Sequence, residues 1–239
     1  MSDDDRSLDL TGVGKLAKAI PASSWNKLVK TTCDTFSQLV SPITESTSGL
    51  GRLIRAKFDG MIDAQKVLAA DAVRRAKDKV EKTGRTPRDK PKAIVLLKAV
   101  ENASYETDQN LRDIWSNLIA NEILENQVHP EFPRLLERMC SNDAVTLAEI
   151  AESTESNRKD SVKHATRAFV YGLQIMGVSF STLVEEQTDF CREHLKNLNL
   201  IRKRSGQWRL TLTGEEFLKA VADPSFEYTE VKQKDSGDA

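Results

Sequence analysis

Residues 112–133 read "RDIWSNLIANEILENQVHPEFP", and this stretch decides the fold. Its apolar residues recur at steps of three and four, which predicts a helix over residues 108–125 with Thr107 or Asp108 as its N-cap. The residues that share the apolar face are Leu111, Ile114, Trp115, Leu118 and Ile119. A stripe of this kind packs against other helices, with the tryptophan as its anchor.

Polar residues on and after this helix raise the question of a site. Asn117 and Asn121 lie four residues apart on its flank, where they either bond to a neighbouring loop or helix end, which we favour, or orient a ligand in a groove. Asparagine does not titrate, so it supplies no acid–base chemistry. Glu122 projects near the middle of the apolar face and must reach the rim, pair with a base or face a partner chain. His129, before Pro130, is either the partner of Glu122 or a turn residue.

Size and composition indicate a soluble, intracellular protein rich in helix. The chain has 239 residues, of which 39% are hydrophobic and 30% charged, enough for one large domain or two small ones. The formal net charge of −1 gives no global attraction to nucleic acid or lipid. Cys33, Cys140 and Cys191 are too widely spaced for a disulfide framework and fit a reducing cytoplasm. The acidic N-terminus lacks the pattern of a signal peptide, and no apolar run approaches the ~20 residues of a membrane span.

The N-terminal part predicts extended helices. We expect helices over residues 8–20 and 23–41, then one long amphipathic helix over 50–82. Residues 49–92 contain 13 Lys or Arg against 6 Asp or Glu, whereas residues 101–155 contain 3 against 12. The positive charges either form a solvated face balanced by neighbouring helices, which we favour, or a basic surface for a protein, nucleic acid or lipid headgroups. The candidate basic surface consists of Arg74, Arg75, Lys77 and Lys79.

The C-terminal part predicts a small winged-helix-like unit with a β-hairpin. Residues 170–180 are rich in β-branched and aromatic types, which favour a short strand, and residues 183–199 predict a helix. The segment "QWRLTL" at 207–212 alternates like a strand. Thr213 and Glu216 then predict a capping box at the start of the last helix.

These patterns together predict a mainly α fold in four segments. An N-terminal amphipathic helical region ends in a linker that Gly84, Pro87 and Pro91 mark, and a helical core, the winged-helix-like unit and a polar tail follow. The predicted boundaries are 1–90 with the linker at 83–91, 91–155, 156–223 and 224–239.

The signature stretch resembles the abortive infection alpha (Abi-alpha) family of bacterial proteins. In that family a helix with the pattern L-W-A-N-L-L-A-N precedes V-H-P-S-F. The segments "GVGKLAKAIP" at 12–21 and "LKNLNLIRKRSGQWRLTLTGEEFLKA" at 195–220 resemble the N- and C-terminal regions of the family more weakly. Glu122 stands where the family usually has a small apolar residue, and Asn142 replaces a proline. The residues that match the signature include Trp115, Asn117, Asn121, His129 and Pro130.

The resemblance implies antiphage defence of abortive-infection type. The family is grouped by similarity to proteins linked to phage resistance, and it brings no assigned catalytic residues. The sequence contains no catalytic motif, so we favour a protein that is not an enzyme over the weaker alternative of a nuclease or other effector enzyme, and we expect no cofactor. We expect it to act through contacts of its helices with a host or phage protein, or with a membrane surface.

A DNA- or RNA-binding regulator is the alternative function. The predicted hairpin carries Arg202, Lys203 and Arg204, which suit a phosphate backbone. The helix over 183–199 carries more acidic than basic residues, which disfavours its insertion into a groove lined by phosphates. Cys191 and His194 form a C-x-x-H pair, but no second pair of ligands lies at a useful spacing, so we expect no metal site.

Overall fold

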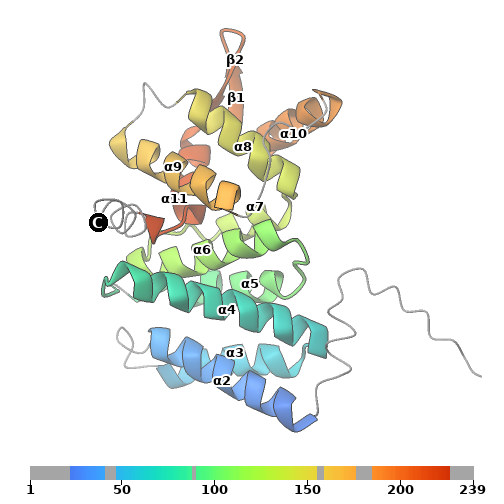
Figure 1. Ribbon diagram of the computed structural model, residues 1–239, viewed down its shortest axis with the longest axis vertical. Helices are drawn as coiled ribbons and strands as arrows, with labels where there is room; N and C mark the ends of the chain where they lie inside the picture. The colour runs from blue at the N-terminus through green and yellow to red at the C-terminus, as the bar shows by residue number, and fades with distance from the viewer. Residues whose placement is uncertain (1–21, 41–46, 88–89, 155–158, 176–184, 227–239) are drawn as a thin grey trace, which may run out of the picture.

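The computed structural model describes residues 22–40, 47–87, 90–154, 159–175 and 185–226, which form a stack of helices with a β-hairpin at one end (Figure 1). The helices in these ranges are α2 (Ala22–Val40), α3 (Thr47–Asp59), α4 (Asp63–Thr83), α5 (Ala93–Ala103), α6 (Gln109–Glu125), α7 (Phe132–Glu137), α8 (Ser141–Ser153), α9 (Asp160–Ile175), α10 (Glu185–Asn197) and α11 (Leu212–Val221). The strands β1 (Ile201–Arg204) and β2 (Gln207–Leu210) pair antiparallel, with Ile201 opposite Leu210. This arrangement confirms the mainly α fold with a short C-terminal hairpin.

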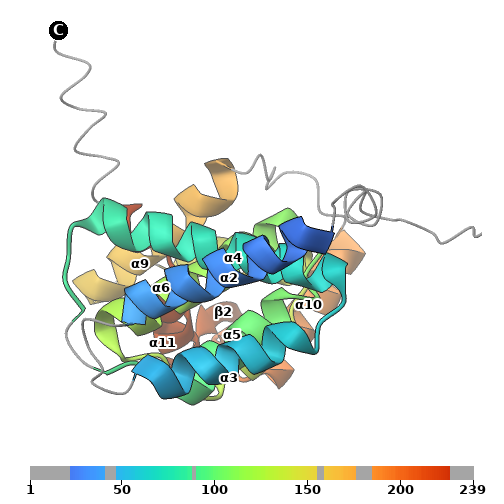
Figure 2. The ribbon, with the colours of Figure 1, turned by 90° about the horizontal axis from the view of Figure 1, so that it is seen from below.

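The helices lie in successive layers along the long axis of the molecule. Helices α2 and α3 form one end, and Figure 2 shows them lying across α4 and α5. Helix α6 comes next and contacts α4, α5 and α11. Helices α8, α9 and α11 follow, and α10 and the hairpin lie at the far end (Figure 1). Buried hydrophobic residues from Val29 to Phe226 belong to a single cluster, so the layers share one core.

Helix α6 is the centre of this core. Asp108 caps its first turn, because the side chain accepts hydrogen bonds from the backbone N–H groups of Asn110 and Leu111. Asn126 ends it in the left-handed region with φ 50°. The predicted helix over 108–125 is thus confirmed. Trp115 is 1% exposed, and buried residues occur on every side of the helix, so its polar side chains must find partners inside the protein.

The long helix predicted over 50–82 is two helices, α3 and α4. Gly60 ends α3, and Ile62 is extended, with φ −72° and ψ 162°. The side chain of Gln65 accepts a hydrogen bond from the Ile62 N–H at 3.0 Å, which satisfies a backbone group at the break. Apolar periodicity continues through this short interruption, and the prediction of one helix was therefore wrong.

The N-cap of the last helix, α11, is Thr211 and not the predicted Thr213. The Thr211 side chain accepts a hydrogen bond from the Gly214 N–H at 3.0 Å, so Thr211 is the N-cap, and the capping box at Thr213 and Glu216 is wrong. Glu216 instead pairs with Lys219 at 2.8 Å. A Cβ atom on Gly214 would lie 2.0 Å from the Leu200 carbonyl oxygen, so only glycine fits between α11 and the start of the hairpin.

One further expectation for the C-terminal part, the strand at 170–180, fails where the structure describes it. Residues 170–175 belong to α9 rather than to a strand, and residues 176–184 lie outside the described residues. Phe226 is 5% exposed and contacts His164 and Tyr171, so the start of the predicted polar tail packs on α9. The helix predicted over 8–20 also lies outside the described residues. Among the helices described, none is both long enough and apolar enough to cross a bilayer.

Candidate functional site

The two signature asparagines bind the C-terminal end of α11. Asn117 donates from Nδ2 to the Val221 carbonyl at 2.9 Å. Asn121 donates to the carbonyls of Ala220 at 2.9 Å and Ala222 at 2.8 Å. Carbonyls in the last turn of a helix lack partners within the helix, so these amides satisfy them and fix α11 on α6. The asparagines therefore have the structural role that we favoured, bonding to a helix end.

Glu122 joins α6 to the start of α5. Its side chain is fully buried and accepts hydrogen bonds from the backbone N–H groups of Lys92 and, at 3.2 Å, Val128. The Lys92 ammonium lies 3.7 Å from the carboxylate and also donates to the Asn126 side chain at 3.0 Å. Burial raises the pKa of Glu122, and the hydrogen bonds and charge of Lys92 oppose that rise. The carboxylate thus pairs with a base and stabilises the N-terminus of α5.

His129 is a turn residue and does not contact Glu122. Its Nδ1 accepts a hydrogen bond from the Glu131 N–H at 3.2 Å, and its ring lies 5.7 Å from that of Phe132. Phe132 in turn makes an edge contact with Phe217 of α11, with ring centroids 5.5 Å apart. The His-Pro segment therefore turns the chain so that Phe132 reaches the core against α11.

A groove lies between this turn and the N-terminal end of α11. Its volume is about 420 Å³. Leu212 stands 74% exposed at its edge, and Glu131 and Glu216 place carboxylates on its rim. We call it the signature groove, and its lining residues are Gln127, His129, Glu131, Phe132, Leu135, Leu212, Thr213 and Glu216. The family signature thus shapes one wall of an open, largely apolar depression.

The candidate basic surface on α4 is not a set of unpaired cations. Arg74 pairs with Asp71 at 2.7 Å and Asp78 at 3.1 Å, and Lys77 pairs with Glu81 at 3.0 Å. The positive charge on this helix is therefore largely balanced by its own acidic residues. Arg74 and Lys77 therefore belong to a solvated face with balanced charges, as we favoured.

Lys79 and Arg75 belong to a buried ion cluster instead of a surface. The Lys79 ammonium lies 2.9 Å from both Asp113 and Asp223, and its side chain is only 8% exposed. Arg75 pairs with Asp71 at 2.7 Å and lies 3.6 Å from Asp113. Burial alone would raise the pKa of Asp223, yet the charge of Lys79 and hydrogen bonds from Ser225 and Lys79 hold it below its ordinary value. Lys79 therefore cannot be part of an exposed basic surface.

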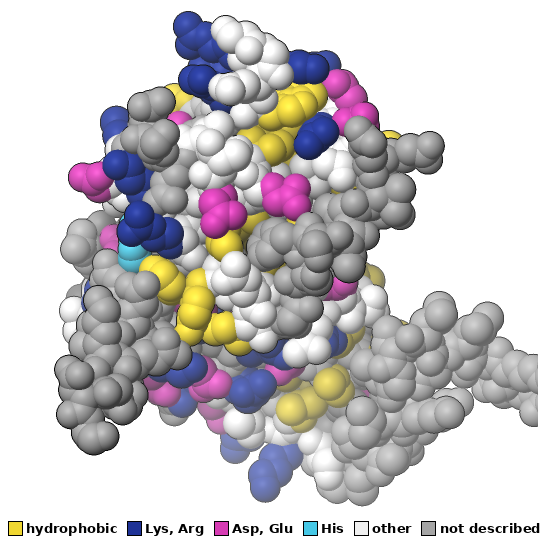
Figure 3. Space-filling view, turned by 45° about the horizontal axis from the view of Figure 1, so that its top comes forward, with side chains coloured by type: hydrophobic (Ala, Val, Ile, Leu, Met, Phe, Trp, Pro, Cys, Tyr) yellow, Lys and Arg dark blue, Asp and Glu magenta, His cyan; other side chains and the backbone are white. Residues whose placement is uncertain are grey.

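The hairpin carries the exposed cations of the C-terminal end. Arg202, Lys203 and Arg204 are exposed, and the Lys203 ammonium lies 5.5 Å above the ring of Trp208. Figure 3 shows Lys and Arg side chains gathered at this end of the molecule. On α10, Lys196 pairs with Glu193 at 2.8 Å. The hairpin is thus more available for an acidic partner than the helix before it.

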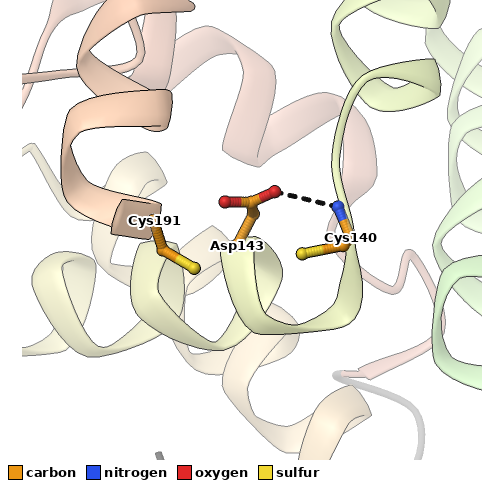
Figure 4. A group of neighbouring side chains, drawn as sticks. All are labelled: Cys140, Asp143 and Cys191. Carbon is orange, nitrogen blue, oxygen red and sulfur yellow. Dashed lines mark hydrogen bonds between the residues drawn. The ribbon is translucent and has the colours of Figure 1, made fainter. Parts of the chain in front are cut away.

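Side chains of α8 and α10 converge at a second place. Cys140 precedes α8, Asp143 lies in its first turn and Cys191 lies on α10, and their ligand-type atoms are all within 4.8 Å of one another (Figure 4). His194 Nδ1 lies 3.1 Å from Asp143 Oδ2. Burial, reinforced by the charge of Asp143, raises the pKa of Cys191 to about 12, and burial also raises that of Cys140.

The sequence pattern did not predict this cluster, although it identified one half of it, the C-x-x-H pair of Cys191 and His194. The second half is the C-x-x-D pair of Cys140 and Asp143, which has the same spacing as Cys191 and His194. Because 47 residues separate Asp143 from Cys191, only the packing of α8 against α10 brings the pairs together.

The fold and these sites define a helical protein whose signature residues tie its helices together beside an open groove. Comparison with known families identifies the family to which the chain belongs. The model of the family described as abortive infection alpha matches residues 65–237, and the chain belongs to this family. Membership indicates a link to abortive-infection defence. Neither the curated proteins nor the solved structures contain a significant match.

The segment "LTLTGEEF" at 210–217, which lies in the part of the chain that resembles the family's C-terminal region, now has a physical explanation. Leu210 and Phe217 are buried in the core, Thr211 caps α11, and Gly214 lies against the Leu200 carbonyl. Each of these positions fixes how α11 leaves the hairpin. Helices α2 and α3 precede the matched residues, so the family match begins within α4.

Proposed function

We propose that this protein acts in abortive-infection defence by binding a protein partner of host or phage origin through the signature groove. Membership of the abortive infection alpha family supports the defence role. The observation that carries the binding role is the groove itself, since the family signature forms its wall and leaves it open. The amide nitrogens of Asn117 and Asn121 donate to the end of α11, and the Glu122 carboxylate accepts from the backbone of Lys92 and Val128, which favours recognition over catalysis by this helix.

The chemistry of the groove indicates what kind of segment would fit. Phe132, Leu135 and Leu212 give an apolar floor and edge, which suits one or two apolar side chains of a partner. On the rim, Glu131 and Glu216 pair with Arg134 at 3.3 Å and Lys219 at 2.8 Å, so the edge of the groove is polar with its charges balanced. The groove therefore suits a helix or loop that presents an apolar anchor with polar residues beside it.

A phage challenge with one groove variant and one matched control tests this proposal. Leu212→Asp places a charge at a side chain that is 74% exposed, so it should leave the fold intact. Leu53→Asp makes the same change on α3, where the side chain is 52% exposed and far from the groove. Bacteria expressing the wild type or Leu53→Asp should survive at a low phage-to-cell ratio and collapse at a high one.

Cells with Leu212→Asp should lyse like cells with empty vector at both ratios, while circular dichroism shows unchanged helix content. Full protection by Leu212→Asp would overturn the role of the groove. Equal phage growth with the wild type and the empty vector, across phages of several types, would instead overturn the defence role.

Nucleic-acid binding by the hairpin is the second candidate. The order α8, α9, α10, β1 and β2 resembles that of a winged helix, and Arg202, Lys203 and Arg204 project from the wing into solvent. Replacing all three by serine should weaken DNA or RNA binding and reduce the slope of log affinity against log salt by up to about 3, one for each lost phosphate contact. An unchanged slope would exclude the hairpin as the contact.

A further inference from the structure

We propose that Cys140, Asp143 and Cys191 form a binding site for a thiophilic divalent cation of the zinc type. Two sulfur atoms and a carboxylate oxygen are ligands that zinc takes in proteins. With Zn–S bonds of about 2.3 Å and tetrahedral angles, two ligand sulfurs lie about 3.8 Å apart. The three ligand atoms here already lie within 4.8 Å of one another, so closing around an ion requires shifts of about an ångström.

The local fold presents these ligands from two helices. Cys140 is the N-cap of α8, and Asp143 Oδ2 accepts the Cys140 backbone N–H at 2.9 Å, which fixes the carboxylate. Cys191 reaches the same point from α10, which packs on α8. Figure 4 shows the two sulfur atoms on either side of the carboxylate. An ion held here would join α8 to the helix that leads into the hairpin.

A second observation points to a ligand independently of the spacing. Asp143 is only 1% exposed, yet among the described residues its Oδ1 atom accepts no hydrogen bond from a nitrogen or oxygen donor, and the two thiols beside it are weak donors. Buried carboxylate oxygens normally have partners, because an unsatisfied one loses its hydration without replacement. A cation bound to Oδ1 would supply the missing interaction, while Oδ2 keeps the Cys140 N–H.

The surroundings contain the parts that support a metal ligand. His194 Nδ1 lies 3.1 Å from Asp143 Oδ2, so the imidazole is placed to orient the carboxylate. Hydrogen-bonded partners of this kind are a regular feature of metal sites. Cys140 is exposed, which gives the ion a path from solvent, and water can occupy the remaining coordination position. Binding converts both thiols to thiolates, and the two protons leave to solvent.

Cobalt substitution tests the site in the full-length protein, purified under reducing conditions and without a metal-binding tag. The wild type should bind one Co²⁺ with a thiolate-to-cobalt charge-transfer band and the visible bands of a four-coordinate ion. One equivalent of Zn²⁺ should displace it and raise the midpoint of thermal unfolding. Cys33→Ala, which removes the cysteine on α2, is the matched control and should give the same spectrum.

Variants at the ligands then decide the outcome. Cys140→Ala alters an exposed side chain and should halve the charge-transfer intensity and weaken Co²⁺ binding by more than about 100-fold. His194→Ala should weaken binding by about 10–100-fold and keep the intensity, as expected for a side chain that acts through a ligand. Absence of the charge-transfer band in the wild type, or an unchanged spectrum in Cys140→Ala, would overturn the proposal.

Discussion

Replacement of Lys79 by methionine should cost more stability than any other charge removal on α4. Its ammonium lies 2.9 Å from both Asp113 and Asp223, in a cluster between α4, α6 and the segment after α11. Methionine keeps most of the length of the side chain and removes the ammonium, which leaves two largely buried carboxylates facing each other. Loss of one partner from a buried ion pair costs about 3–5 kcal/mol.

Other contacts place the expected value at the low end of that range. Asp113 keeps Arg75 at 3.6 Å, and Asp223 keeps the Ser225 N–H at 2.8 Å and its hydroxyl at 2.7 Å. We therefore expect the free energy of unfolding to fall by about 3 kcal/mol in Lys79→Met. The double variant Lys79→Met with Asp223→Asn should recover part of this loss, because it removes one of the stranded charges.

Arg74→Met is the matched control on the same helix. Arg74 also pairs with two aspartates, but its side chain is 62% exposed, so the pairs are screened by solvent. The free energy of unfolding should fall by less than about 1 kcal/mol. Urea unfolding followed by far-ultraviolet circular dichroism, with the slope m held in common, measures both variants. Equal losses in the two variants would refute the enclosed ion cluster.

The pH dependence of stability gives the same prediction a second readout. The pKa of Asp223 in the folded protein lies below its ordinary value of 3.8, so this group stabilises the fold above that pH. Its contribution is lost as the pH falls through the folded pKa, where the carboxylate takes up a proton. The wild type should lose stability across this acid range, and Lys79→Met should show a flatter dependence there.

Three further substitutions, measured by the same unfolding experiment, test a close approach, a buried carboxylate and a helix cap. Gly214→Ala should cost at least about 3 kcal/mol, because its Cβ would lie 2.0 Å from the Leu200 carbonyl oxygen, and a cost below 1 would contradict the close approach. Glu122→Gln should cost about 1–3 kcal/mol, since an amide nitrogen cannot accept the backbone N–H that one carboxylate oxygen now accepts; an unchanged midpoint would argue against that pairing. Asp108→Ala should cost about 0.5–2 kcal/mol through the lost N-cap, whereas Asp108→Asn should retain most of the stability.

Much of the fold could be predicted from local patterns in the sequence. The stripe around Trp115 and the candidate caps Thr107 and Asp108 placed α6 within a residue of its observed start, because periodicity and capping depend on neighbours in the chain. The same signals could not find the break at Gly60, since the apolar stripe resumes in register after one short turn. They also led to the choice of Thr213 rather than Thr211 as the cap of α11. The observed cap depends on where β2 ends and on the contact of Gly214 with Leu200.

The sites could not be predicted from residue types alone, because the residues that form them lie far apart in the chain. The partners of Lys79 lie 34 and 144 residues away, so a count of charges on α4 could not show that this lysine is enclosed. The two halves of the cysteine cluster each have a simple spacing, but their meeting depends on how α8 packs against α10. Periodicity identifies which face of a helix is buried and leaves open which helix covers it.

The position of the signature also determines how loss of function should be interpreted. Asn117 and Asn121 hold the end of α11, and the start of α11 forms one wall of the signature groove. Replacing either asparagine would displace α11 and thereby alter the groove, even though neither amide needs to touch a partner. Loss of defence in such a variant would therefore be compatible with any role for the groove. Leu212 lies on the surface of the same helix without holding it in place, and for this reason its substitution can separate recognition from folding.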